Sequence, residues 1–382
     1  MPGGRVDGNL VVPDGLGLST YLGAVRRWLV VVLVAVLLVG VPVAVRHRPG
    51  GGPTTAPSAA LLARIQASAT VGWSGRAESR GSLSLPSSDS FATLGELLGG
   101  QVELRAWWRS ARSWRVDRIR STGETDTFRD GGGQVRWIFE SERATFSPVS
   151  TIRLPDAVDV LPATLGRDLL QGARVDELSA LAGRRVAGVD AVGLTLRPAE
   201  AATTVDHVDL WFEPTTGLPL RVDLYGRGAA QPVLTTAFTD LTLQAPDPAA
   251  VRFSAPADVT LAYEESTDVA AAANALEQLD LPATVAGLST RDGQDPGAVG
   301  VYGRGPTTMI VFPLRGSVAR PLRDQLSRNG AATETAAGTL APVGPITVLL
   351  TRVPGRGGGF LLAGTVTPET LTAAAAQLQE GA

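Results

Sequence analysis

The chain has 382 residues, of which 34 are basic, 37 are acidic and 44% are hydrophobic, and its net charge is −3. This charge argues against a general nucleic-acid binder, while the length and hydrophobic content suffice for two or three domains with sizeable cores. The sequence contains no cysteine, which excludes disulfides, zinc thiolates, iron–sulfur clusters and thiol nucleophiles, and no lysine, which excludes a Walker-type phosphate loop and a Schiff base.

An uncharged apolar stretch, Trp28–Val45, is the first feature along the chain. It is about 18 residues long, the low end of the length that spans a bilayer as a helix, and arginines flank it on both sides. Its length and the long tail before it favour a retained signal anchor, with a cleaved signal peptide as the alternative. We therefore expect a disordered tail at 1–27, one transmembrane helix at 28–45 and a Gly/Pro linker at 46–58. Charge alone leaves the orientation of the span nearly undecided.

Residues 59–263 read as a β-rich domain that begins with a helix. Ala59–Thr70 carries apolar residues at helical spacing after a possible Ser58 cap. Apolar and polar residues then alternate, which predicts strands at 101–108, 114–119 and 134–139, with a turn signal at 130–133. Between 155 and 182 leucines recur at helical spacings, including Leu178 and Leu181, so one or two short helices are expected to lie over the sheet.

The clearest hairpin is Val205–Tyr225. Leu210 and Phe212 fall on the apolar face of its first strand, Pro214 presets a turn, and Gly217 can adopt the left-handed conformation that ends it. A further strand is expected at 233–243.

The last part, 268–382, is long enough for a separate small α+β domain. A helix is expected at 266–279, and a final helix from the Thr367 cap and Pro368 to about Gln379. Four apolar runs between them predict strands, at 299–302, 308–314, 346–353 and 360–366.

Tryptophan and arginine are concentrated in the β-rich region. Six tryptophans there can line an apolar cavity or simply form the core, and the core is the commoner role. Six arginines between Arg105 and Arg120 can grip anionic groups, but a solvated outer face of a hairpin is the preferred interpretation.

The sequence offers no arrangement of catalytic residues. His207 lies beside Asp206 and Asp209, but strand alternation turns neighbouring side chains to opposite faces, so a solvated surface histidine is expected. Nucleophile-elbow, zinc-protease and calcium-loop patterns are absent from the sequence. We expect a protein that is not an enzyme, with no cofactor and no metal site.

Three segments occur in an order typical of a known superfamily: GRRVAG at 183–188, LTLRP at 194–198 and LWFEPTTGLPLR at 210–221. With them, residues 59–263 resemble the LolA-like superfamily, particularly the N-terminal domain of the RseB (MucB) sigma-E regulatory proteins. Residues 281–312 are similar to the small second domain of RseB. The resemblance implies an α+β fold in which a curved, half-open antiparallel sheet holds helices on its concave side and is followed by a small α+β domain.

The resemblance also implies a function and partners. RseB-like proteins sense lipid or lipoprotein signals and bind a single-pass anti-sigma factor, so we expect a membrane-anchored extracytoplasmic binding module for acyl chains, with a sensing or regulatory role. The alternative is a lipid or lipoprotein carrier of the LolA type. The N-terminus is then cytoplasmic and both domains lie outside, with 268–382 as the partner-binding half. This chain departs from RseB in carrying its own apparent anchor.

The acyl-binding residues expected from strand alternation are all apolar and lie on predicted strands of the first domain. They are Leu104, Trp108, Val135, Trp137, Phe139, Leu210 and Phe212.

Overall fold

The structure is a computed structural model that describes residues 55–83, 92–148, 155–256, 259, 261–263, 281–291, 299–314, 316–328, 331–351 and 359–380. The predicted tail and span, most of the linker and the helix expected at 266–279 lie outside these residues. Within them, no helix combines the length and the apolar character needed to cross a membrane.

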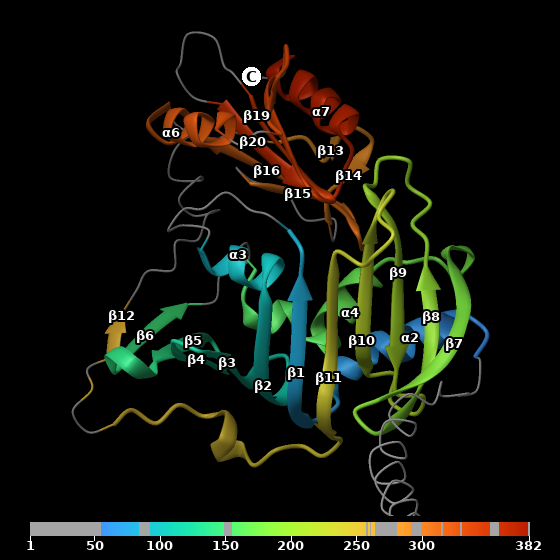
Figure 1. The fold of residues 1–382 in the computed structure, drawn as a ribbon, viewed down its shortest axis with the longest axis vertical. Helices are drawn as coiled ribbons and strands as arrows, with labels where there is room; N and C mark the ends of the chain where they lie inside the picture. The colour runs from blue at the N-terminus through green and yellow to red at the C-terminus, as the bar shows by residue number, and fades with distance from the viewer. Residues whose placement is uncertain are drawn as a thin grey trace, which may run out of the picture. The chain divides into compact units, whose positions relative to one another are not determined.

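A twelve-stranded sheet organises the first part of the chain, in the order β12-β6-β5-β4-β3-β2-β1-β11-β10-β9-β8-β7 (Figure 1). All neighbouring strands are antiparallel except β12 and β6, which are parallel. Figure 1 shows the sheet bending, with β3 to β6 turned away from the row formed by β1, β11, β10 and β9. The large antiparallel sheet expected from the sequence is therefore confirmed. Its strands are β1 Trp73–Gly81, β2 Gln101–Ser110, β3 Ser113–Arg120, β4 Gly123–Asp130, β5 Gly133–Ile138, β6 Arg143–Pro148, β7 Leu178–Val186, β8 Val189–Leu196, β9 Val205–Phe212, β10 Pro219–Gly226, β11 Leu234–Thr242 and β12 Leu261–Tyr263.

The helices of this part are short. They are α2 Ala59–Ala67, η1 Ser68–Thr70, α3 Ala92–Gly99, η3 Phe139–Ser141, η4 Ala157–Val160, α4 Pro162–Leu169, η5 Val175–Glu177 and η6 Pro248–Val251. The expected Ser58 cap is confirmed, since its hydroxyl accepts from the backbone N–H of Leu61 at 3.2 Å. The helical interpretation of Leu178 and Leu181 is wrong, because both lie in β7. A register shift after Leu181 breaks the two-residue alternation of this strand, and the broken pattern imitates helical spacing.

Several elements of this part were not predicted individually, among them β4 and α3. The sequence of β4, GETDTFRD, is polar on both faces, so it carries no alternation that would mark a strand. The helix α3 is short and contains glycine, a poor helix former.

The hairpin of β9 and β10 has the predicted turn, and α2 packs against it. Glu213 closes the turn by accepting from the backbone N–H groups of Thr215 and Thr216, at 3.0 and 2.6 Å. Gly217 has a φ of +75°, and a Cβ there would lie 2.9 Å from backbone atoms of Arg64 in α2. Glycine is therefore required twice, by the turn and by the close approach of the helix.

A six-stranded antiparallel sheet forms the C-terminal part, in the order β15-β16-β20-β19-β18-β17. Val311, Leu349 and Leu362 face a cluster with α7, whereas Leu361 and Val348 pack with α6, so the two helices cover opposite faces. The four predicted strands and the final helix are confirmed, while α6, β13, β14, β17 and β18 were not predicted. The bounds are β13 Thr284–Val285, β14 Leu288–Ser289, β15 Gly300–Arg304, β16 Thr307–Leu314, α6 Gly316–Ser327, β17 Thr333–Glu334, β18 Gly338–Val343, β19 Ile346–Thr351, β20 Gly359–Gly364 and α7 Pro368–Glu380.

Candidate functional site

One face of the twelve-stranded sheet is apolar and carries the helices, and we call it the inner face. Thr236 of β11 donates its hydroxyl hydrogen to the carbonyl of Val160 in η4 at 2.7 Å. Gly166 of α4 lies so close to β10 that a Cβ would meet the side chains of Pro219 and Val222. The inner face is therefore in direct contact with η4 and α4.

Three indole rings form a ladder across the inner face. Strand register places Trp73, Trp108 and Trp114 opposite one another on β1, β2 and β3. Their centroids are 6.1 and 6.3 Å apart with nearly parallel planes, and Phe238 of β11 meets Trp73 edge-on at 4.9 Å. The indole N–H of Trp108 donates to the carbonyl of Ala69 at 2.9 Å, which attaches η1 to the ladder.

The predicted acyl-binding residues fall into separate places. Leu104 and Trp108 belong to the cluster that contains the tryptophan ladder, and Leu210 and Phe212 belong to a second cluster with Leu61 of α2. Register puts both pairs on the inner face.

The other three predicted residues lie elsewhere. Val135 and Trp137 lie on the opposite face of the sheet, where they pack with Phe253. Phe139 is 65% exposed in η3. The structure thus brings together two pairs on one face, and does not gather all seven residues.

Two buried arginines lie on the inner side, and the sequence analysis placed neither of them there. Arg118 of β3 and Arg167 of α4 are each 7% exposed, and burial lowers the pKa of both guanidinium groups. Arg118 Nη1 lies 3.4 Å from a carboxylate oxygen of Glu96 in α3. The signal was available for Arg118, because it continues the inward alternation of Trp114 and Val116. The outer-face interpretation of the arginine run is right for Arg105 and Arg115 and wrong for Arg118.

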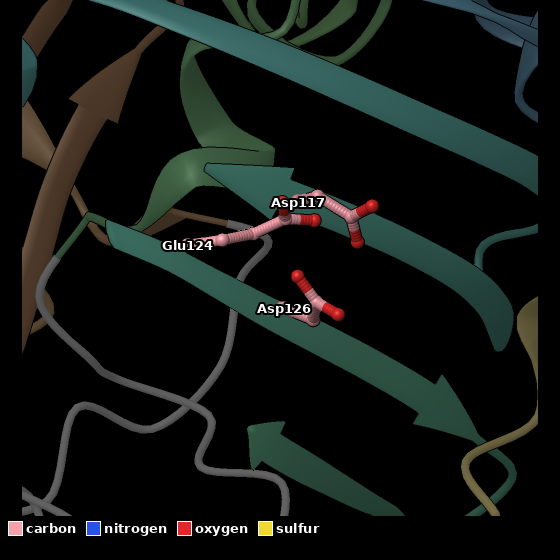
Figure 2. Close-up of side chains that lie close together, drawn as sticks. All are labelled: Asp117, Glu124 and Asp126. Atoms are coloured by element: carbon pink, nitrogen blue, oxygen red, sulfur yellow. The ribbon is translucent and has the colours of Figure 1, made fainter. Parts of the chain in front are cut away.

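The opposite face carries an acidic cluster on β3 and β4 (Figure 2). Carboxylate oxygens of Asp117, Glu124 and Asp126 lie within 4.8 Å of one another. Arg115 pairs with Asp117 at 2.6 Å and with Asp126 at 2.9 Å, and Arg105 pairs with Glu124 at 2.9 Å. Three carboxylates and two guanidinium groups therefore form one network, in which each carboxylate has at least one oxygen paired with an arginine. We read it as an ion-pair network that ties β2, β3 and β4 together.

The charge of this network predicts a dependence of stability on pH. Burial, followed by the charge of Asp117, raises the pKa of Asp126 from 3.8 to about 7. The folded state thus holds a proton that the unfolded state releases, so the free energy of unfolding should fall as pH rises from 4 to 7. We expect a loss on the order of 2 kcal/mol over this range.

Unfolding by urea at pH 5, 6, 7 and 8 measures this dependence. Asp126→Asn should flatten the profile, whereas Asp130→Asn should not, because Asp130 lies on the same strand in an exposed ion pair with Arg252. An unchanged slope in Asp126→Asn would contradict the assignment.

The two sheets are joined at a buried carboxylate. The side chain of Glu177, at the end of η5, is 1% exposed and accepts from Arg304 of β15 at 2.7 and 2.8 Å. Arg304 also donates to the carbonyl of Gly172 at 2.7 Å and pairs with Glu200. Although burial opposes ionisation, the hydrogen bonds from Arg304 and from the backbone lower the pKa of Glu177 to about 2.

A pocket of about 390 Å³ lies beside this junction. Its lining combines the charged side chains of Glu200, Arg291 and Arg304 with the apolar side chain of Leu288.

Solved structures supply the comparisons, since no family model matches the chain and no curated protein does. The MucA/MucB complex of Pseudomonas aeruginosa matches with a TM-score of 0.42 and 18% identity, over 83% of this chain and 96% of that one. A LolA superfamily protein from Nitrosomonas europaea matches with a TM-score of 0.26 and 11% identity, over 52% and 99%. An uncharacterized conserved protein from Thermus thermophilus matches with a TM-score of 0.33 and 12% identity, over 54% and 98%. Solved structures of MucB and of a LolA superfamily protein are thus among those that the chain matches.

The sequence predicts a solvated His207, but in the structure its side chain is only 19% exposed. Its ring stacks on Tyr225 at 4.2 Å, and its Nδ1 lies 2.6 Å from a carboxylate oxygen of Asp206. A register shift of the hairpin at Tyr225 and Gly226 relaxes the strict alternation here, which lets neighbouring side chains meet. His207 and Tyr225 lie on the polar face of the hairpin. Their stacking and the contact with Asp206 fix the orientation of the imidazole.

Proposed function

We propose that residues 59–263 bind the acyl chains of a lipid or lipoprotein at the inner face of the twelve-stranded sheet. The observation that carries the proposal is how this face is covered. Its apolar strands meet only short helices: α2 has 9 residues, η4 has 4 and α4 has 8. Helices of this length are marginal without their tertiary contacts, whereas each strand is held by hydrogen bonds to its neighbours.

Such a cover can give way to a ligand at low cost. An acyl chain that enters between α4 and the sheet replaces one apolar contact with another, so little apolar surface is exposed to water during the exchange. The tryptophan ladder and the second cluster both offer apolar surface on the inner face.

Quenching of tryptophan fluorescence by a brominated fatty acid tests this site. Bromine quenches only indoles close to the bound chain, so the ladder should be quenched and Trp137, on the opposite face, should not. Trp108→Phe is expected to reduce the quenched amplitude by about a third if the three ladder indoles contribute equally, whereas Trp137→Phe should leave it unchanged. Equal effects of the two substitutions would contradict the inner-face site, and no quenching at all would contradict acyl binding.

We further propose that Trp28–Val45 anchors the protein in the cell membrane, with the N-terminus in the cytoplasm and both domains outside. The uncharged stretch and the location of the proteins that the sequence resembles support this placement. Protease added to intact protoplasts should digest the region after Arg48. Its full protection would refute the orientation.

The proposed role is sensing or regulation, without catalysis. Its expected partner is a single-pass membrane protein such as an anti-sigma factor, held by residues 268–382. A carrier of lipid or lipoprotein is the second candidate, and transfer of bound lipid to acceptor vesicles separates the two. A sensor should keep its lipid until the partner is added, and a carrier should deliver it without one.

A further inference from the structure

Unpaired hydrogen-bond donors occur inside the apolar inner face, beside one ring of the tryptophan ladder. The guanidinium carbon of Arg167 lies 5.4 Å from the centre of the Trp108 ring, and Nη1 of Arg167 is buried without a hydrogen-bond partner. The ring of Trp73 lies 6.1 Å from the same centre, and its indole N–H is also buried without a partner. Both nitrogen atoms are hydrogen-bond donors, and each of them lacks an acceptor.

Arg167 is one of two buried arginines among the described residues. Its guanidinium makes no side-chain hydrogen bond and no ion pair there, and its closest interaction is with the Trp108 ring. Arg118, which is equally buried, has Glu96 as its counter-ion. A buried cation without a partner costs several kcal/mol, which is more than one cation–π contact returns.

Thr164 carries a further unpaired polar group among the described residues. It precedes Arg167 by three residues on α4, so the two side chains share one side of the helix. Its Oγ1 is also buried without a hydrogen-bond partner. Arg167 and Thr164 of α4 and Trp73 of β1 thus each carry an unsatisfied polar atom.

We propose that Arg167, with Thr164 and Trp73, binds the oxyanion of an anionic amphiphile, a phosphate or a carboxylate, whose chains occupy the inner face. The proposal rests on the proposed acyl binding and specifies its ligand class. Oxyanions accept several hydrogen bonds and pair well with guanidinium, and a water-excluded site strengthens both interactions. The module would then select its ligand by headgroup charge and retain it through the chains.

Binding of two matched lipids tests this selectivity. The full-length protein in a non-ionic detergent is titrated with pyrene-labelled phosphatidylglycerol and with pyrene-labelled diacylglycerol, which carries the same chains and no oxyanion, and energy transfer from tryptophan reports binding. We expect phosphatidylglycerol to bind about tenfold more tightly, the value of one charge-assisted hydrogen bond. Arg167→Met should reduce this preference to about one while leaving the binding of diacylglycerol unchanged.

The control is Arg184→Met. Arg184 also lies over an indole ring, that of Trp211, at 4.8 Å, on the face opposite to Leu210. The Arg184→Met variant should keep the tenfold preference. Arg167→Met should also leave resistance to urea unchanged or increased, because it removes an unpaired buried charge. If the variant is less stable and its lipid preference is unchanged, Arg167 has only a structural role and the proposal is overturned.

The remaining outcomes distinguish a failure of acyl binding from a failure of the oxyanion site. No binding of either lipid would sink the proposed function itself. Equal binding of both lipids by the unaltered protein would sink the oxyanion site and leave acyl binding standing. Inorganic phosphate alone is the third arm: if it displaces phosphatidylglycerol, the site takes a free anion and the assignment to a lipid headgroup is wrong.

Discussion

Replacing Trp73 with alanine is expected to destabilise the protein by about 3–5 kcal/mol, the range found when a large buried aromatic side chain is deleted. Trp73 has no exposed surface and lies between Trp108 on β2 and Phe238 on β11. It therefore holds the centre of the twelve-stranded sheet, where the two halves of the sheet meet at β1. A cavity at this position cannot collapse easily, because the strands on both sides are fixed by their hydrogen bonds.

Unfolding by urea, followed by circular dichroism, measures this loss. Trp107→Ala is the matched control: it removes the same side chain from β2, on the opposite face, where Trp107 is only half-buried beneath Arg115. We expect its cost to be less than half that of Trp73→Ala. Trp73→Phe should cost less than Trp73→Ala, since it leaves a smaller cavity and the indole N–H that it removes has no hydrogen-bond partner. Equal losses for Trp73→Ala and Trp107→Ala would show that the ladder is not the core of the sheet.

The parts of the fold that were predicted are those with local signals. The hairpin at 205–225, the caps at Ser58 and Thr367 and the apolar strands of the second sheet each follow from a few adjacent residues. The strand β4 could not be found in this way, because GETDTFRD is polar on both faces and becomes a strand through its pairing with β3 and β5.

The site was harder to predict for a related reason. The alternation of apolar and polar residues shows which side chains of one strand share a face. Only the register between paired strands shows which faces of different strands lie on the same side of the sheet. Val135 and Trp137 were grouped with Leu104 because each is apolar within its own strand. The pairing through β4 places them on the opposite face. Arg167 could not be placed from sequence at all, since its burial depends on how α4 lies over β2.

Replacing Arg304 with methionine is expected to weaken the junction between the two sheets by about 3 kcal/mol. The reason lies with its partner, because the Glu177 carboxylate is buried and would lose the guanidinium that neutralises it. Methionine keeps the apolar stem of the side chain and removes the guanidinium, together with its charge and its hydrogen bond to the carbonyl of Gly172. The backbone N–H groups of Arg174 and Ala199 still donate to Glu177, at 2.8 and 2.9 Å, so the carboxylate is not left entirely without partners.

The pH dependence of this variant identifies the cause of the loss. The pKa of Glu177 is about 2 in the folded protein, below the ordinary value of 4.5, so its contribution to stability is present above pH 4.5 and lost as pH falls towards 2. Arg304→Met should therefore cost most at neutral pH and least at pH 2 to 3, where Glu177 becomes protonated and needs no counter-ion. Arg185→Met, which breaks an exposed pair with Asp190, is the control and should cost less than about 1 kcal/mol at any pH. A loss in Arg304→Met that stayed constant from pH 7 to pH 3 would mean that packing, and not the charge of Glu177, holds the two sheets together.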